Sequence, residues 1–324
     1  NGFAVGLSGP LSGAGGLTKE GTGMLTLSGL NSYLGTTSVN AGTLAVNNGA
    51  VGGAIADGAG AVSVAMGAEL QLLASETVSS YVGAGDGVGS NDSLLALGAN
   101  TLTTLGNATI ANVTTTVGGG IIAGGAIIDG DDDLNITGPN LFLQAASGIG
   151  AGTTLETAVS AIQLHNTMSG DINVLNSVGG LLTISELRPL GGFGLRNDGG
   201  STTVVNGSPL TVAASSVSAG TLTFTATDDD DVGTLDDDLT INALVTVEST
   251  GANVVLNAGD DALLNGNVTA ATQVTINVDF GDAETPPMLP ALDVSGGVLT
   301  IAATSVITTP LATSGGGAYL NGNG

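Results

Sequence analysis

The chain has 324 residues, with three cationic side chains against 28 acidic ones and a net charge of -25. Nucleic acids are bound mainly by clustered lysine and arginine, so this charge excludes them as partners and disfavours anionic lipid surfaces. Cysteine is absent, which excludes disulfides, thiolate metal sites and a cysteine nucleophile. No apolar run approaches the roughly 20 residues that a membrane-spanning helix needs.

The composition predicts a narrow core. Apolar residues make up 42% of the chain, but aromatic residues only 2%, and tryptophan is absent. A wide globular interior normally draws on large aromatic side chains. We therefore expect a thin, layered core that is filled by alanine, valine, leucine and isoleucine.

Along the chain, apolar residues alternate with threonine, serine or asparagine, and glycine, asparagine or aspartate interrupts the pattern at short intervals. Such alternation predicts short β-strands separated by turns. The strands are expected at 24–29, 43–48, 61–66, 69–74, 133–138, 141–146, 171–176, 181–186, 210–215, 221–226, 239–244, 254–259, 274–279 and 298–303. Residues 154–166 also fit a single helical turn, so that alternative stays open.

Similar strands at regular spacing predict a repeat architecture. The apolar pairs Leu222/Phe224, Leu239/Ile241, Val254/Leu256, Val274/Ile276 and Leu299/Ile301 recur every 15 to 25 residues. We interpret one interval as one coil of a β-solenoid. Sandwich domains and transmembrane barrels normally carry aromatic residues that this chain lacks. The predicted fold class is all-β: a single-chain parallel β-helix, right-handed, with corners rich in glycine, asparagine and aspartate.

Asparagines that directly follow strand candidates are expected at the corners of the solenoid. Corner residues with positive φ are most easily supplied by glycine and asparagine. The asparagines concerned are Asn47, Asn242, Asn257 and Asn277.

Residues 15–46 contain a spaced pattern of glycines and aliphatic residues. Its positions are Leu17, Thr18, Gly21, Gly23, Leu25, Leu27, Gly29, Asn31, Tyr33, Gly35, Thr37, Val39, Gly42, Thr43, Leu44 and Val46. This pattern closely resembles the autotransporter-associated β-strand repeat of secreted passenger domains. The resemblance implies coils of β-helix in an exported bacterial surface protein, and it brings no catalytic residue with it.

A second resemblance extends from about Asp129 to Phe280. Phrases such as "SGDINVLNSVGGLLTI" (169–184) and "VVLNAGDDALLNGNVTA" (254–270) are similar to repeats of giant bacterial surface proteins of the filamentous-haemagglutinin type. We accordingly divide the chain into N-terminal coils at 1–128 and continuing coils with acidic loops at 129–324. A proline-rich excursion is expected at 284–290.

The acidic runs are the strongest candidate sites. Clustered carboxylates and turn carbonyls supply the oxygen ligands that Ca2+ prefers. Calcium loops are predicted at Asp129, Asp131, Asp132 and Asp133, and at Asp228, Asp229, Asp230, Asp231, Asp236, Asp237 and Asp238. The alternative is a solvated acidic loop that discourages edge-to-edge aggregation. The spacings match neither an EF-hand nor a calcium nonapeptide.

Enzymatic chemistry has little support in the sequence. A Ser-His-Asp triad would have to use His165, the single histidine, and that residue is expected at the surface or at a coil corner. Paired carboxylates suffice for glycoside hydrolysis, but the aromatic platforms that usually hold sugars are scarce. We expect no enzymatic activity and no cofactor apart from Ca2+.

The interpretation that follows is an extracellular or cell-surface β-solenoid with a structural role. Its uncapped ends would pair with further copies, which predicts self-association into a rod or fibre. Two alternatives remain: an adhesin that binds glycans or cell-surface proteins, for example through Phe193 or Phe280, and a polysaccharide-active enzyme.

Overall fold

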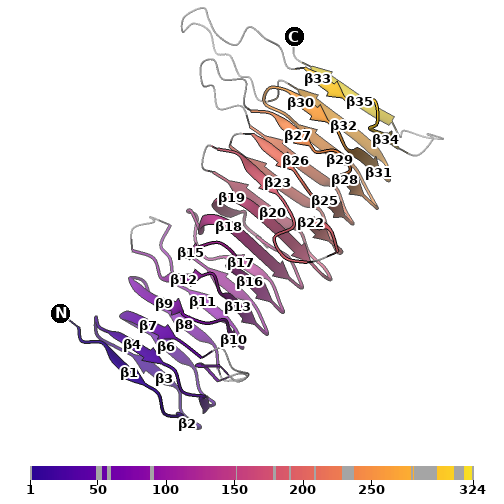
Figure 1. Cartoon of the computed structure of the whole chain (residues 1–324). Helices are drawn as coiled ribbons and strands as arrows, with labels where there is room; N and C mark the ends of the chain where they lie inside the picture. Colours follow the sequence, from indigo (N-terminus) through magenta and orange to yellow (C-terminus); the bar gives the residue numbers. More distant parts are fainter. Residues whose placement is uncertain are drawn as a thin grey trace, which may run out of the picture. The chain divides into compact units, whose positions relative to one another are not determined.

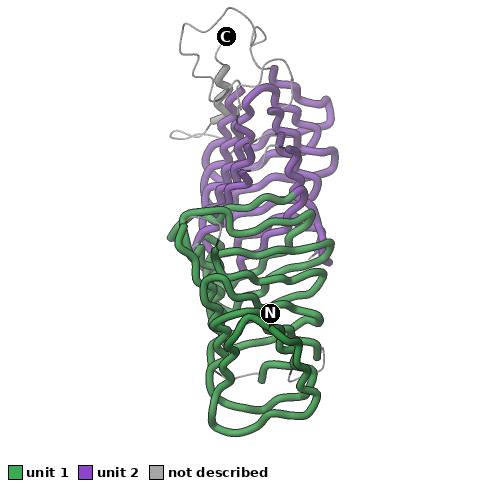
Figure 2. Tube along the Cα trace, turned by 90° about the vertical axis from the view of Figure 1, so that its left-hand side faces the viewer, with its two compact units in different colours: residues 1–159 green, residues 160–324 purple. Residues whose placement is uncertain are grey.

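The computed structural model describes residues 2–48, 53–56, 60–87, 91–150, 152–177, 180–189, 191–207, 209–227, 237–278, 280, 298–309 and 317–322. All named elements in these ranges are β-strands (Figure 1). They fall into two compact units, residues 1–159 and residues 160–324, and each is described by itself (Figure 2). The described part of the chain holds no helix of the length and apolarity that crossing a membrane requires.

Unit 1 consists of parallel strands stacked in columns. The β1 column contains β1 (Val5–Leu7), β4 (Met24–Leu27), β7 (Gly42–Val46), β9 (Ala68–Leu72), β12 (Leu94–Gly98), β15 (Asn112–Thr115) and the start of β18 (Ile136–Ala145). The β3 column contains β3 (Leu17–Lys19), β6 (Thr37–Val39), β8 (Val62–Val64), β11 (Tyr81–Gly83), β14 (Ala108–Ile110) and β17 (Ile127–Asp129). The β10 column contains β10 (Glu76–Val78), β13 (Thr101–Thr104), β16 (Gly120–Ala123) and the end of β18, and β2 (Ser12–Gly13) pairs with β5 (Ser32–Tyr33).

Unit 2 repeats the same plan. The β20 column contains β20 (Ile172–Asn176), β23 (Thr202–Asn206), β26 (Leu222–Ala226), β29 (Val254–Asn257), β32 (Gln273–Val278) and β35 (Gly317–Gly322). The β21 column contains β21 (Leu182–Ile184), β24 (Leu210–Val212), β27 (Leu239–Ile241), β30 (Ala262–Leu264) and β33 (Leu299–Ile301). The β22 column contains β22 (Phe193–Asn197), β25 (Ser215–Ser218), β28 (Thr246–Ser249), β31 (Asn267–Ala270) and β34 (Ile307–Thr308).

These columns confirm the all-β parallel solenoid, but they correct the expected length of a coil. Leu222 of β26 pairs with Val254 of β29, whereas Leu239 of β27 pairs with Ala262 of β30. The step from Leu222 to Leu239 therefore leads from one face to another within a single coil. Equating every interval between apolar pairs with a full coil is wrong, because strands on different faces carry the same pattern.

The segment with the helical alternative is a strand. The division between the units falls within β19 (Leu155–Asn166), whose residues from Ala161 onward pair with β21 and β22. Side chains along its first half alternate between buried and partly exposed positions. That two-residue period is the one an extended backbone imposes, so the strand is confirmed and the helical alternative is wrong.

The core is narrow and aliphatic, as its composition predicts. Strands of both units alternate buried and partly exposed residues, and the buried positions hold mainly leucine, isoleucine, valine and alanine. Tyr81 in unit 1 and Phe224 in unit 2 are the largest fully buried side chains. Each lies in a stack of aliphatic residues that occupy equivalent positions of neighbouring coils.

The repeat at 17–46 spans the strands β3 to β7. Asn31 accepts a hydrogen bond from the Leu11 amide at 2.7 Å and donates one to the Ala54 carbonyl, so it joins neighbouring coils. The Tyr33 hydroxyl lies 2.6 Å from the Thr37 hydroxyl in the buried interior. Gly42 has φ +65°, and a Cβ there would lie 2.6 Å from the Gly21 carbonyl oxygen, so this position requires glycine.

Asparagine contributes through its side chain and not through a left-handed backbone. Among the described residues, Leu244 is the non-glycine residue with positive φ, at 67°. Asn257 is instead the last residue of β29 and Asn277 the last but one of β32, and Asn277 Nδ2 donates a 2.6 Å hydrogen bond to Asn257 Oδ1. Asn47 and Asn242 do directly follow β7 and β27, as expected for corner residues, but none of these asparagines has the positive φ that is expected at corners.

Candidate functional site

Two loops of unit 1 bring acidic side chains together at stacked corners. Residues 84–93 connect β11 to β12, and residues 130–135 connect β17 to β18. The corner of the intervening coil, between β14 and β15, is the single residue Ala111. The strands before these corners (β11, β14 and β17) pair with one another, and so do the strands after them (β12, β15 and β18). The two longer loops therefore lie on either side of the short Ala111 corner and can contact each other over it.

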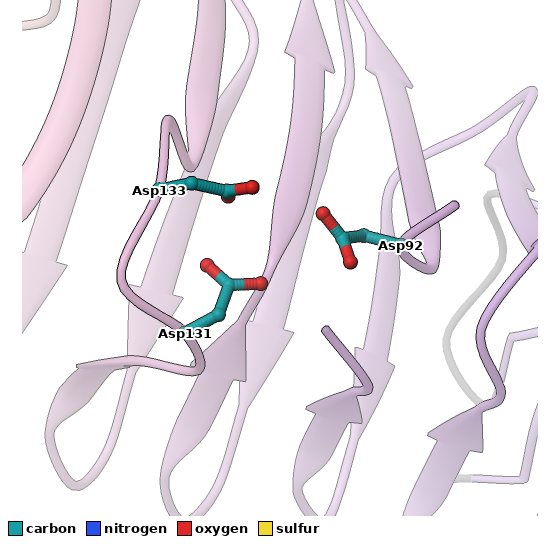
Figure 3. Close-up of side chains that lie close together, drawn as sticks. All are labelled: Asp92, Asp131 and Asp133. Atoms are coloured by element: carbon teal, nitrogen blue, oxygen red, sulfur yellow. The ribbon is translucent and has the colours of Figure 1, made fainter. Parts of the chain in front are cut away.

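The three carboxylates that meet there belong to Asp92, Asp131 and Asp133, and they point toward one another (Figure 3). One oxygen from each lies within 4.8 Å of the others. All the donors are carboxylate oxygens, which suit a hard divalent cation such as Ca2+.

Asp92 is held in place from its own loop. Its side chain is only 7% exposed, and its Oδ1 accepts a 3.0 Å hydrogen bond from the Asp86 amide. The following residue, Ser93, donates its amide to the Ala84 carbonyl at 2.8 Å, which closes the loop. The second oxygen of Asp92, Oδ2, is buried without a hydrogen-bond partner.

The predicted run at 129–133 divides into three roles. Asp129 stabilises the turn, because its Oδ1 accepts hydrogen bonds from the Asp131 amide at 3.0 Å and from Asn135 Nδ2 at 2.8 Å. Asp131 and Asp133 turn toward Asp92, and Oδ2 of Asp131 and both oxygens of Asp133 are buried without a hydrogen-bond partner. Asp132 is exposed to solvent.

Asn135 fixes this loop to the coils on both sides. The side chain is fully buried; its Nδ2 also lies 3.2 Å from Asp131 Oδ1, and its Oδ1 accepts a 2.9 Å hydrogen bond from the Glu156 amide. The Glu156 carboxylate adds further negative charge, and its pKa is raised by burial and by Asp129. The loop at 130–135 is therefore held in place by Asn135, and the site is rich in negative charge.

Asp131 and Asp133 hold their protons more tightly than an ordinary aspartate does. Burial, followed by the charge of Asp133, raises the pKa of Asp131 to about 7. Burial also raises the pKa of Asp133. Burial and like charges disfavour the ionised form of a carboxylate, whereas a nearby positive charge would favour it. The raised pKa values therefore indicate that no positive charge among the described residues lies close enough to compensate them.

The rest of the predicted set lies apart or outside the described residues. Asp237 and Asp238 precede β27 and lie beside Asp260 and Asp261, where the Asp261 amide donates to Asp238 Oδ1 at 3.1 Å. The remaining members, Asp228, Asp229, Asp230, Asp231 and Asp236, lie outside the described residues, as does the excursion at 284–290. Calcium binding there stays a prediction.

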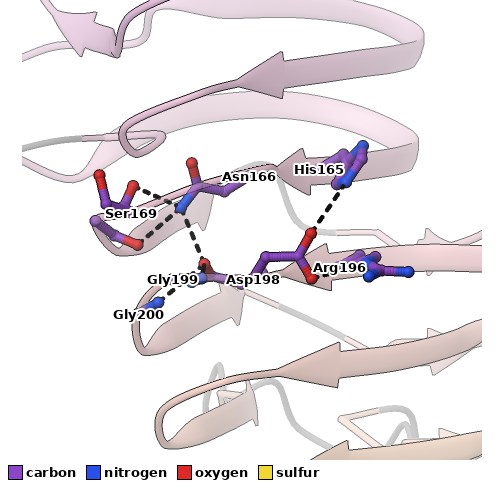
Figure 4. A network of polar contacts seen from close by, with 9 residues as sticks. His165, Asn166, Ser169, Arg196, Asp198, Gly199 and Gly200 are labelled. Carbon is purple, nitrogen blue, oxygen red and sulfur yellow. Dashed lines mark hydrogen bonds and ion pairs between the residues drawn. The ribbon is translucent and has the colours of Figure 1, made fainter.

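His165 lies within β19 and not at a corner. Its Nε2 is 3.8 Å from Asp198 Oδ2, and the other carboxylate oxygen of Asp198 accepts a 2.8 Å hydrogen bond from Arg196 Nε (Figure 4). Its Nδ1 is buried without a hydrogen-bond partner. A base that activates serine needs a ring nitrogen hydrogen-bonded to the hydroxyl, and this arrangement gives His165 no such contact.

Fold and repeat together define a parallel β-solenoid that carries the autotransporter-associated repeat. Residues 17–46 match the model of the passenger-associated-transport-repeat. Over 239 residues the chain is 30% identical to the adhesin BmaC autotransporter of Brucella suis biovar 1 (strain 1330). The match covers 69% of this chain and 7% of that protein. No solved structure matches the chain.

Sequence reasoning missed Asp92. It is a single acidic residue in the stretch "GSNDSLL" at 89–95, with no run or motif around it. Only the stacking of the corners places it beside Asp131 and Asp133, so the strand register was the missing information.

Proposed function

We propose that the chain is part of the extracellular passenger of an autotransporter adhesin and that it works by binding, without catalysis. The observation that supports this function is the similarity to the BmaC adhesin, over 69% of the chain, in a protein that also carries the passenger repeat. Parallel coils suit the role, because each coil is stabilised by its neighbours while its corners remain free to present loops.

The ligand class that we propose is a glycan or a protein on a cell surface. Unit 2 presents apolar side chains to solvent, among them Leu244 (99% exposed), Met168 (72%) and Phe280 (40%). Exposed apolar groups on a rigid scaffold are typical contact residues of binding surfaces. Phe193 is less suited, since it is half-buried and the Arg196 guanidinium lies 5.4 Å from its ring centre.

A cell-binding assay tests this function. Fluorescently labelled chain is expected to bind fixed cells saturably, and prior enzymatic removal of surface glycans distinguishes a glycan ligand from a protein ligand. Leu244→Ser should weaken binding, whereas Thr240→Ser, on the neighbouring strand β27, should not. Absence of saturable binding, or release of reducing sugar ends from polysaccharides, would contradict the proposal.

We also propose that a second copy stacks on the first coil of unit 1, which would give an extracellular fibre. The supporting observation is the way in which coils stack: Leu7 of β1 pairs with Leu27 of β4, which is fully buried, and a second copy would extend such a column by the same parallel pairing. Electron microscopy and sedimentation of the concentrated chain should reveal end-to-end assemblies. Val5→Lys should shorten them, and the control Thr18→Lys, at an exposed position of β3, should not. Monomers alone at high concentration would refute stacking.

A further inference from the structure

We propose that Asp92, Asp131 and Asp133 bind one Ca2+ ion and that this ion joins two corners of unit 1 that lie two coils apart, on either side of the Ala111 corner. One carboxylate oxygen from each residue lies within 4.8 Å of the others. Ca2+ binds oxygen at 2.3–2.6 Å, so two ligands of one ion lie at most about 5 Å apart. A single ion therefore reaches all three side chains without rearrangement of the loops.

The buried oxygens distinguish this site from an ordinary acidic surface loop. Asp92 is 7% exposed, its carboxylate faces Asp131 and Asp133 (Figure 3), and its Oδ2 has no hydrogen-bond partner. A buried carboxylate oxygen that lacks a partner destabilises the folded state, because it has lost its hydrogen bonds to water and has formed none with the protein. Coordination to a cation replaces the lost water.

The chain supplies no counterion of its own to these carboxylates. Lys19 is the single cationic residue in the sequence of unit 1. Its Nζ donates hydrogen bonds to three backbone carbonyls, those of Glu20, Gly21 and Ala41, at 2.6–3.0 Å. Lys19 therefore does not compensate the charge of these carboxylates, and a bound metal ion would do so.

The donor set and its placement favour calcium over other metals. Zinc and copper prefer imidazole or thiolate, but the chain has no cysteine, and its single histidine lies in unit 2. Magnesium requires a near-ideal octahedron at shorter distances, whereas calcium accepts six to eight oxygens in irregular geometry. Three carboxylates on two irregular loops, with water completing the shell, match the calcium requirement.

The neighbouring backbone is shaped around the site. A methyl group at Gly85 would overlap Asp131 Oδ2 and would lie 2.9 Å from the Ala111 Cβ. Gly85 thus lies against the loop at 130–135, next to the one-residue corner at Ala111. An ion there would provide the cross-coil contact that the short middle corner cannot make.

Thermal unfolding of the whole chain, first treated with a chelator and then titrated with Ca2+ or Mg2+, tests the site. Calcium sites of extracellular proteins bind at about 10⁻⁴–10⁻³ M, so ~10 mM Ca2+ should lower the unfolding equilibrium constant about 10- to 100-fold. Mg2+ should act much more weakly. Calorimetric titration with Ca2+ should show one site fewer in Asp92→Asn than in the wild type. No response to Ca2+, or an equal response to Mg2+, would overturn the proposal.

Three variants separate binding from folding. Asp92→Asn and Asp133→Asn keep the side-chain shape but remove charge, so both should fold without metal at least as stably as the wild type and lose the response to Ca2+. Asp132→Asn, exposed in the same loop, should keep the full response. A full response in Asp92→Asn would refute the site. These outcomes do not bear on ligand binding by unit 2, so the proposed adhesin function is tested separately.

Discussion

Asn166 and Asn197 lie 31 residues apart, and the side-chain Nδ2 of Asn166 donates a 2.9 Å hydrogen bond to Oδ1 of Asn197 on the next coil. The two residues are partners in the register of β19 and β22. Asn176 and Asn206 form the same contact at 2.8 Å in the β20 column. Buried amide ladders therefore fix the register at strand ends, because a slip by one residue would leave each amide unsatisfied.

The ladder predicts a large cost for Asn197→Ala. Asn197 Oδ1 also accepts hydrogen bonds from the Gly199 and Gly200 amides, and its Nδ2 donates to the Ser201 carbonyl at 2.9 Å. Removing these contacts leaves buried groups unpaired, which should destabilise unit 2 by about 2–4 kcal/mol. Denaturant unfolding measures this loss. Thr203→Ala, on the partly exposed side of β23, is the control, and an equal loss in both variants would contradict the ladder's role.

The core stack predicts that Phe224→Ala is equally damaging. Phe224 is fully buried and lies between Val204 of β23 and Leu256 of β29. A cavity of this size should cost about 3–5 kcal/mol, because the narrow stack has few side chains that can move inward. Thr223→Ala should change stability by no more than ~0.5 kcal/mol. A small effect of Phe224→Ala in thermal unfolding would mean that the stack collapses around the cavity.

The buried carboxylate of Glu76 is expected to stabilise the backbone at Ala54 and Ile55. It is 3% exposed, and its oxygens accept hydrogen bonds from the amides of Ala54 at 2.9 Å and Ile55 at 3.2 Å. Glu76→Ala leaves both buried amides without an acceptor and should cost about 2–4 kcal/mol. Hydrogen exchange should show faster exchange at Ala54 and Ile55. Glu20→Ala, at an exposed position, should leave both rates unchanged; unchanged rates in Glu76→Ala would refute the assignment.

Replacement of Leu244 by glycine is expected to stabilise the protein. It combines φ 67° with 99% exposure, so its side chain has strain and little packing. A left-handed backbone costs an L-residue roughly 1–2 kcal/mol, which exceeds the entropy cost of introducing glycine. Leu244→Gly should therefore raise the melting temperature. Leu34→Gly, 67% exposed without positive φ, should lower it. The same sign for both variants would contradict the strain.

The stability of unit 2 is expected to depend on pH through His165. Burial lowers the pKa of His165, and the nearby Asp198 carboxylate opposes this shift. Since the folded-state pKa lies below the ordinary value of 6.5, protonation favours the unfolded chain, and this contribution to stability is lost as pH falls below about 6.5. His165→Gln should remove that part of the pH dependence.

The single histidine makes this measurement direct, because its imidazole signals in an NMR titration need no assignment. The midpoint should lie below 6.5, and Asp198→Asn should lower it further by removing the charge that favours imidazolium. A midpoint above 6.5 would show that Asp198 dominates over burial.

Strand positions could be read from the sequence because alternation reports which side chains are buried. Ile172 and Val174 of β20, and Leu222 and Phe224 of β26, illustrate this. Pairing between strands could not be read in the same way. All three faces of the coil use the same aliphatic and threonine pattern, so Leu239 of β27 looks like a partner of Leu222, although it lies on another face.

The sequence predicted Asp131 and Asp133 of the candidate site but not Asp92, because strand pairing could not be read from it. Asp131 and Asp133 belong to an acidic run that attracts notice, but the run does not reveal that Asp129 stabilises the turn and Asp132 faces solvent. Asp92 required knowledge of which corners stack. A division of the chain near residue 128 stays a prediction.

The corner that holds only Ala111 in one coil holds residues 84–93 in the coil before it and 130–135 in the coil after it, while the flanking strands keep their pairing. Length changes at this position are thus absorbed locally and do not propagate into neighbouring coils. In evolutionary terms the corner is a permissive insertion point. New surface loops can be acquired and lost there by small insertions and deletions, while selection on the aliphatic interior continues undisturbed.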